Sequence, residues 1–164
     1  MRSAVRPTES SMAIMAIMAI MAIMAITPAA ALIAALATGQ PLGPHQVGCN
    51  VTEMFTEHLH AHLSIEHNGR PVPVPADIGL VTAAHAVICI YWLHTHDDSG
   101  TIHVEAPGGN FTLADFFAVW GQPLSSTRVG PYNGRVRANV NGAPYKGAPQ
   151  NIPLLDGEQI VLRI

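Results

Sequence analysis

The sequence has little charge and little cysteine. Charged side chains make up 12% of its 164 residues, and the net charge is −3 with histidine counted as neutral. Proteins that bind nucleic acid carry clustered Lys and Arg, whereas the basic residues here are few and scattered. We therefore expect no nucleic-acid partner. The hydrophobic fraction of 49% gives a chain of this length enough apolar surface to bury one core.

The N-terminal segment has the composition of a targeting sequence rather than of a fold. Arg2 and Arg6 precede an apolar run at 12–26, and small residues end the segment at 35–37. This order is typical of an export signal, here residues 1–37, that sends the protein to the periplasm or the cell exterior. An uncleaved N-terminal membrane anchor formed by residues 12–37 is the alternative, because that segment is long enough to cross a bilayer.

The rest of the chain divides into a linker and one domain. Gly and Pro are frequent at 38–50, which predicts a linker, and a single His-rich β domain is expected at 51–164. Cys49 and Cys89 are the only two cysteines. In the oxidising compartment that export implies, one disulfide between them is the simplest interpretation.

Histidine is abundant and is concentrated in one part of the sequence. Eight of its nine histidines lie within residues 57–105. Six of them fall in two segments that are predicted as strands, and these are His58, His60, His62, His94, His96 and His103. Side chains two positions apart on a strand point to the same face. A sheet face that gathers this many imidazoles, without interleaved Lys or Arg, predicts a metal site.

Turn residues and hydrophobic periodicity define the predicted elements. Asn68 and Gly69 predict a two-residue hairpin turn, and the prolines at alternate positions of 70–75 predict an edge strand. The segment 87–94 is β-branched and aromatic, which indicates a strand buried on both faces. A four-residue turn at 97–100 would then place His94 opposite His103.

The second half of the domain predicts a helix and two closing strands. A cap at Thr112 and an apolar stripe ending at Gly121 delimit the helix, and alternation predicts strands at 135–140 and 159–164. The expected fold class is therefore α+β, a mainly antiparallel β-sheet with one covering helix in a β-grasp-like arrangement. A small cupin-like β-barrel is the alternative.

The candidate ligands define what the site can bind. His94, His96 and His103 supply three imidazoles, the set found in zinc sites that keep one open position. Imidazole also binds copper, so the expected cofactor is a divalent transition metal, zinc or copper. Glu105 and Glu66 are candidates for a carboxylate ligand or a general base. The histidines at 58–62 complete the same site or form a second one.

Several strings of the sequence resemble a family of uncharacterised exported bacterial proteins. They are HLHAHLSI at 58–65, YWLHTHD at 91–97, IHVE at 102–105, FFxxWGQPL at 116–124 and NIPL at 151–154. The resemblance covers residues 45–164. It implies export and a shared His-rich domain, and it implies no activity.

Three functions are compatible with these observations. The first is an exported protein that captures, buffers or stores a transition metal. The second is a metal-dependent enzyme in which the open position of a three-His site activates water and Glu105 or Glu66 is the base. The third is an interaction module that has a pH-sensitive histidine surface and binds no metal.

Overall fold

The computed structural model describes residues 47–53 and 56–164. The predicted export signal at 1–37, its alternative as a membrane anchor and most of the predicted linker at 38–50 lie outside these residues. The end of that linker range, Cys49–Asn50, forms strand β1. In the described ranges, no helix combines the length and the apolar character that crossing a bilayer needs.

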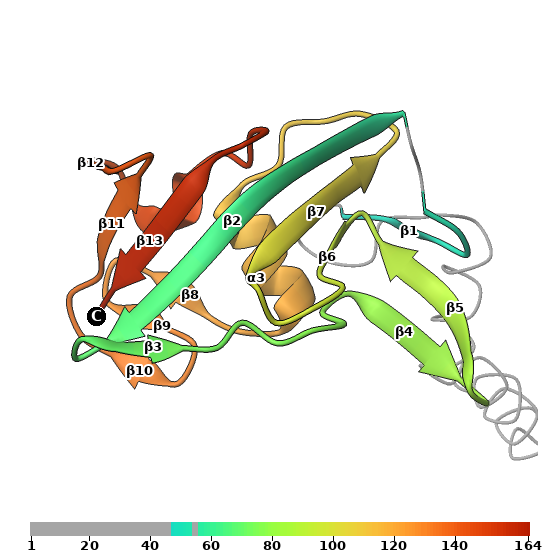
Figure 1. Ribbon diagram of the computed structural model, residues 1–164, viewed down its shortest axis with the longest axis horizontal. Helices are drawn as coiled ribbons and strands as arrows, with labels where there is room; N and C mark the ends of the chain where they lie inside the picture. The colour runs from blue at the N-terminus through green and yellow to red at the C-terminus, as the bar shows by residue number, and fades with distance from the viewer. Residues whose placement is uncertain (1–46, 54–55) are drawn as a thin grey trace, which may run out of the picture. The chain divides into compact units, whose positions relative to one another are not determined.

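The described residues contain a seven-stranded sheet with the long strand β2 (Glu57–His67) near its centre (Figure 1). On one side β2 runs parallel to β13 (Gln159–Arg163), and on the other it runs antiparallel to β7 (Thr101–Ala106). The other strands are antiparallel to their neighbours: β6 (Leu93–His94) beside β7, β11 (Arg137–Val140) beside β13, β12 (Ala143–Pro144) beside β11, and β3 (Arg70–Val72) beside β2.

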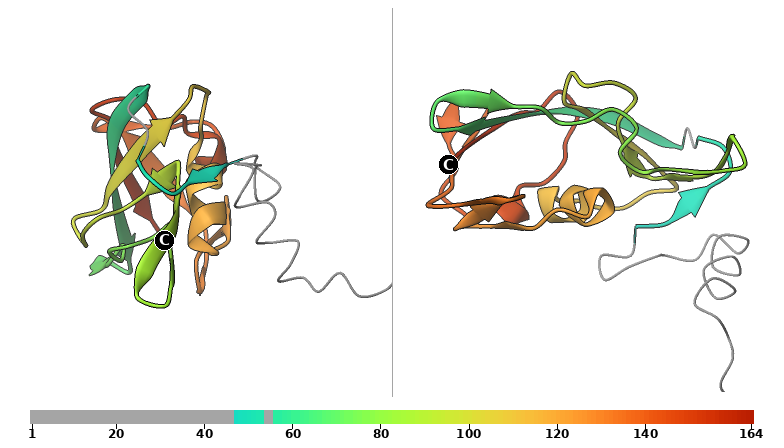
Figure 2. Two further views of the ribbon diagram at one scale, coloured as in Figure 1. Left: turned by 90° about the vertical axis from the view of Figure 1, so that its right-hand side faces the viewer. Right: turned by 90° about the horizontal axis from the view of Figure 1, so that it is seen from below.

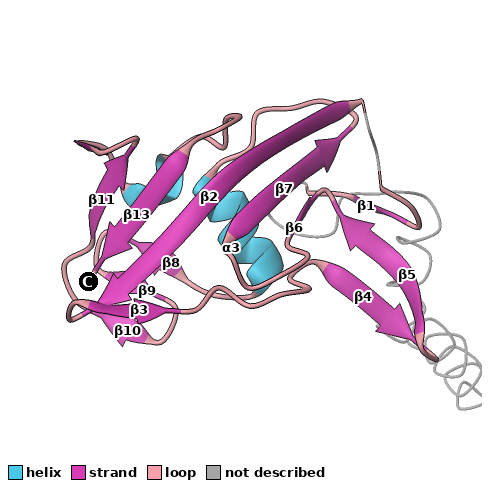
Figure 3. Ribbon diagram, viewed as in Figure 1, coloured by secondary structure: helices cyan, strands magenta, loops and turns pink. Residues whose placement is uncertain are grey.

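This arrangement confirms the predicted α+β class. Helix α3 (Leu113–Trp120) lies between β7 and β11 in the chain and covers one face of the sheet (Figure 2). Strands make up most of the regular structure (Figure 3). With its two central strands parallel and its helix inserted between the flanking pairs, the fold is β-grasp-like. Within the described residues the sheet is open, with edges at β12 and β6, so the cupin-like barrel is wrong.

The β2–β3 hairpin turns at the predicted position. Asn68 and Gly69 have φ values of 52° and 74°, the left-handed conformation that this two-residue turn requires. Strand β3 ends at Val72 and is shorter than the predicted 70–75. Beyond its end, the backbone of β2 bonds to the carbonyl oxygen of Gly100 instead. The prolines at alternate positions remove N–H groups on the side of the strand away from β2, which agrees with β3 pairing with β2 alone among the described strands.

The apolar face of the sheet and the helix form the core. Ala61 and Leu63 of β2 are buried on this face, beneath Phe116 and Phe117 of the helix. The helix begins as predicted, since the Asp115 carboxylate accepts a hydrogen bond from the Thr112 backbone N–H at 2.7 Å. The alternate residues of β2 therefore point to the opposite face, where the histidines lie.

The strand predicted at 87–94 is divided between two sheets. Its first part, β5 (Ala86–Tyr91), joins β1 and β4 (Leu80–Ala83) in a separate three-stranded sheet. The expected burial on both faces is wrong, because Val87 and Ile88 are exposed. β-branched residues favour a strand whether or not it is buried. The composition therefore predicted the strand but not the sheet that it joins.

The predicted disulfide is present. Cys49 of β1 and Cys89 of β5 are bonded, with their Cα atoms 5.6 Å apart, and both side chains are buried. The bond fastens the start of the described chain to the strand that leads into β6. Residues 50–53 are thereby held beside the histidine segments.

The segment between α3 and β11 also contains regular structure. The loop at 122–134 forms a small sheet of three two-residue strands, β8 (Leu124–Ser125), β9 (Arg128–Val129) and β10 (Tyr132–Asn133). Further along the chain, between β12 and β13, residues Pro149–Asn151 form a 3-10 helix, η2.

Candidate metal centre

Three neighbouring strands bring the histidines together. In the register of the sheet, His60 of β2 pairs with His103 of β7, and His103 pairs in turn with His94 of β6. His58 pairs with Glu105 in the same way. Directly opposed side chains have Cβ atoms about 4.5–5.5 Å apart and share a face. The predicted opposition of His94 and His103 is confirmed, and the sheet extends the row to a third strand.

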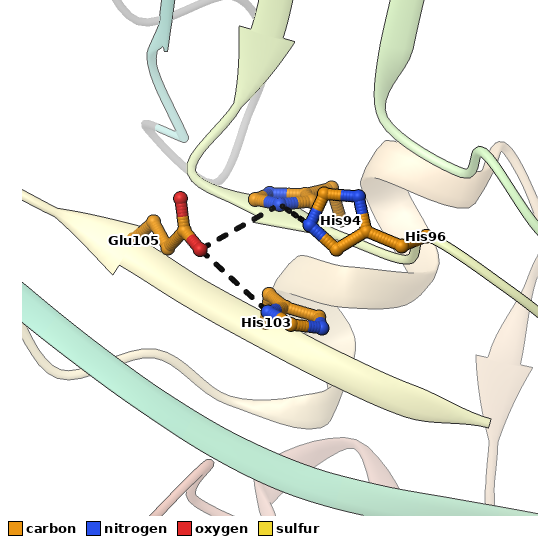
Figure 4. Close-up of side chains that lie close together, drawn as sticks. All are labelled: His94, His96, His103 and Glu105. Carbon is orange, nitrogen blue, oxygen red and sulfur yellow. Dashed lines mark hydrogen bonds and ion pairs between the residues drawn. The ribbon is translucent and has the colours of Figure 1, made fainter. Parts of the chain in front are cut away.

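Four of these side chains form a compact group of donors. They are His94, His96, His103 and Glu105, whose nearest ligand atoms all lie within 4.8 Å of one another (Figure 4). The Nε2 atoms of His94 and His96 are 3.2 Å apart. The Oε1 atom of Glu105 lies 3.6 Å from His103 Nδ1 and 4.0 Å from His94 Nε2.

His94 is held in the tautomer that a metal ligand needs. Its side chain is fully buried, and its Nδ1 lies 2.9 Å from the carbonyl oxygen of Tyr91. A carbonyl only accepts hydrogen bonds, so Nδ1 carries the proton and Nε2 presents its lone pair to the group. Burial lowers the pKa of His94 to about 4, an effect that the charges of His96 and His58 strengthen. The ring is therefore neutral and ready to coordinate at pH 7.

His103 and Glu105 contribute buried polar atoms that the protein leaves unsatisfied. Burial first, and the neighbouring histidines second, lower the pKa of His103 to about 4. Burial also raises the pKa of Glu105, although the nearby imidazoles oppose this effect. Among the described residues, neither His103 Nδ1 nor Glu105 Oε2 has a hydrogen-bond partner. Buried polar atoms are rarely left without partners, and a metal ion held by this group would give both atoms one.

A second group of donors lies beside the first. It consists of His58, His60 and His103. The Nε2 atoms of His58 and His60 are 3.2 Å apart, and the ring of His60 meets that of His103 edge to face at 4.5 Å. His58 Nε2 is also 3.3 Å from Glu105 Oε1. Five of the six predicted histidine ligands therefore gather around Glu105.

Two of the predicted site residues lie elsewhere. His62 is outside both groups and pairs in register with Thr101 of β7. Glu66 forms an ion pair with Arg163, whose Nε donates to it at 2.9 Å. Glu66 is also eight residues along β2 from His58, a distance of roughly 26 Å at the rise of an extended strand. Of the two carboxylates, Glu105 is the one that the fold brings to the histidines.

The structure adds one acidic residue that the sequence did not indicate. The carboxylate of Glu53 lies 3.6 Å from His96 Nε2. The segment that contains it has no clear periodicity, and only the disulfide pairing of Cys49 with Cys89 pointed to its position, because that bond fixes residues 50–53 near the second histidine segment.

Several donor separations are near those of a tetrahedral metal site. Zinc–nitrogen bonds of about 2.0–2.1 Å separate the ligand atoms of a tetrahedral ion by about 3.3–3.4 Å. Three of the donor separations, at 3.2, 3.6 and 4.0 Å, are close to this value, and all four donors lie within 4.8 Å of one another. Three imidazoles and a carboxylate are also ligands that suit zinc and copper. Comparison of the chain with protein-family models, curated proteins and solved structures finds no match.

Proposed function

We propose that this chain is an exported protein that binds a divalent transition metal, zinc or copper, at His94, His96, His103 and Glu105. The observation that carries the proposal is the state of His94. The buried ring donates a hydrogen bond from Nδ1–H to the Tyr91 carbonyl, and its Nε2 lies 3.2 Å from Nε2 of His96. Metal-bound histidines are commonly held in this manner.

The number of donors favours capture or storage of the ion over catalysis. Metal sites with four protein ligands are closed, whereas catalytic zinc sites keep one position for water. Here Glu105 can fill the fourth position beside the three histidines. As a ligand it is no longer a general base acting on water at the ion, which is the role that the metal-dependent enzyme would require.

Burial counts against the pH-sensitive interaction surface. A residue that recognises a protein partner has to be accessible, but His94 is fully buried and only 3% of Glu105 is exposed, which leaves His58 and His96, at 39% and 42%, as the accessible members of the cluster. Desolvation of the Glu105 carboxylate, whose Oε2 has no hydrogen-bond partner among the described residues, costs free energy. A cluster that encloses such a group is better explained by an ion that compensates for the cost.

Two observations support export. The disulfide between Cys49 and Cys89 is of a kind that persists in oxidising compartments. Residues 1–37 have the order of an export signal. The motifs that resemble exported bacterial proteins point in the same direction.

The proposal is tested by zinc and copper titration of tag-free protein with its disulfide intact. We expect wild-type protein to retain metal through dialysis, and His96→Ala to weaken the tightest binding at least about tenfold. His62→Ala is the matched control, because His62 lies on the same face of β2 as His58 and His60 but outside both donor groups. Wild-type protein that retains neither metal, or equal affinities for wild type and His96→Ala, would overturn the proposal.

A further inference from the structure

More donors surround Glu105 than one ion can use. The two donor groups together contain five histidines and a carboxylate. A tetrahedral zinc ion takes four ligands. If the first ion uses His94, His96, His103 and Glu105, then His58 and His60 remain as two imidazoles whose ring nitrogens converge at 3.2 Å. That separation equals the one between His94 and His96.

Two residues lie between the groups and can serve both. Within the described residues, His103 is the member that the two groups share, and the lone-pair nitrogen of its neutral ring can bind either ion. Glu105 Oε1 is 3.3 Å from His58 Nε2 of one group and 4.0 Å from His94 Nε2 of the other. The second oxygen of this carboxylate is buried and has no hydrogen-bond partner in the described part of the chain. A carboxylate with two available oxygens can bridge a pair of ions.

We propose that the centre binds two transition-metal ions, the second held by His58 and His60, with Glu105 and His103 between the ions. This inference rests on the proposed function. Other metal sites with two ions have spacings of about 3.5–4 Å, which a carboxylate bridge through Glu105 spans.

Acidic residues offset the charge of a second ion. Glu105 lies among the ligands, and Glu53 lies 3.6 Å from His96. On the other side, an Asp156 carboxylate oxygen accepts a hydrogen bond from the His60 backbone N–H at 3.0 Å. Each carboxylate lowers the electrostatic cost of placing two cations close together.

The two positions differ in access to solvent. The first includes the fully buried His94 beside His96, which is 42% exposed, whereas the second has no fully buried histidine, because His58 is 39% exposed and His60 is half-buried. The second ion is therefore the weaker and the faster to exchange. A chelator removes it first.

A single-ion centre in which His58 and His60 only support the ligands is the competing arrangement. Stoichiometry distinguishes the two. Tag-free, disulfide-intact protein is dialysed against excess Zn²⁺, and bound zinc per chain is measured by elemental analysis. We expect two ions for wild type, one for His58→Ala/His60→Ala, and two for the control His62→Ala/His67→Ala. Circular dichroism and retention of the first ion show that the variants are folded.

Each other result has a defined meaning. If the wild-type protein binds no zinc, the proposed function itself is wrong. Wild-type protein that binds one zinc leaves the proposed function standing and overturns the two-ion centre. Two zinc ions in His58→Ala/His60→Ala also overturn it, because the second ion then lies elsewhere.

The proximity of the ions is tested with Cu²⁺. Two adjacent Cu²⁺ ions give a half-field transition in electron paramagnetic resonance, so we expect this signal in wild type loaded with two copper ions per chain. We expect it to be absent from His58→Ala/His60→Ala. Wild-type protein that holds two copper ions and gives the full-intensity spectrum of two isolated Cu²⁺ ions would contradict a shared centre, because coupling through a bridge gives either the half-field transition or a loss of signal.

Discussion

The two faces of strands β2 and β7 differ in composition although they share one backbone. One face presents Ala61, Ile102 and Val104, each at most 2% exposed and packed in the core under α3. The other presents histidines and the carboxylate of Glu105. Because alternate residues point to opposite sides, a single sheet holds a folding core and a ligand cluster. Substitutions on the core face should change the free energy of unfolding, and those on the histidine face should change metal affinity.

The largest effect is expected from the core face. Phe116 is fully buried, and its replacement in Phe116→Ala should cost about 3–5 kcal/mol of unfolding free energy, since it leaves a cavity. Urea unfolding measures the loss. The milder Ile102→Val should cost only about 0.5–1.5 kcal/mol and leave zinc affinity unchanged. A large fall in zinc affinity for Ile102→Val would show that the two faces are not independent.

The histidine face should make the metal-free protein sensitive to acid. The pKa of His94 is about 4 in the folded protein and 6.5 in the unfolded chain, so the unfolded state binds more protons between these values. Stability is therefore retained above pH 6.5 and lost as the pH falls towards 4, by roughly 3 kcal/mol for this residue. Glu105, whose pKa is raised, acts in the opposite sense and reduces the net slope.

Unfolding by urea at a series of pH values tests this dependence. His94→Asn removes one titrating ring and should reduce the slope between pH 4 and 6.5, while the lowered pKa of His103 keeps part of the dependence. His62→Ala should leave the slope of the wild type. Equal slopes for wild type and His94→Asn would show that His94 does not titrate between these pH values.

Glu105 should separate metal affinity from stability. Glu105→Gln keeps the shape of the side chain but removes the charge, so zinc affinity should fall about 10- to 100-fold. The metal-free protein should become more stable at neutral pH, because burial disfavours the ionised carboxylate. Calorimetric titration and urea unfolding measure the two effects. A decrease in both quantities would indicate that Glu105 supports the fold rather than the ion.

The smallest effect is expected at His62, which lies on the histidine face but outside both donor groups. His62→Ala should change the unfolding free energy by less than about 0.5 kcal/mol and leave zinc affinity as it is. A loss of zinc affinity as large as that of His96→Ala would show that His62 also belongs to the metal centre. Thermal unfolding with and without zinc is a sufficient measurement.

Local patterns predicted the elements whose structure is decided locally. The Asn68–Gly69 turn, the Thr112 cap and the alternation around His58 each depend on residues a few positions apart. The length of the turn at 97–100 was also enough to oppose His94 and His103. These features were enough to predict the α+β class and the presence of the histidines on one face of the sheet.

Features that depend on distant segments were not predictable. The parallel pairing of β2 with β13 joins residues almost a hundred positions apart, and nothing in either strand specifies the other. β5 belongs to a separate sheet because it pairs with β1, and the disulfide between Cys49 and Cys89 links these two strands. That pairing brings Glu53 near His96, and the Tyr91 carbonyl at the end of β5 accepts a hydrogen bond from His94 Nδ1–H.

Anomalous diffraction from crystals soaked in zinc or copper tests the metal centre most directly. We expect a strong peak at the absorption edge about 2.0–2.2 Å from His94 Nε2, His96 Nε2, a His103 ring nitrogen and a Glu105 oxygen. Rings of these histidines that point apart, with no peak among them, would contradict the account.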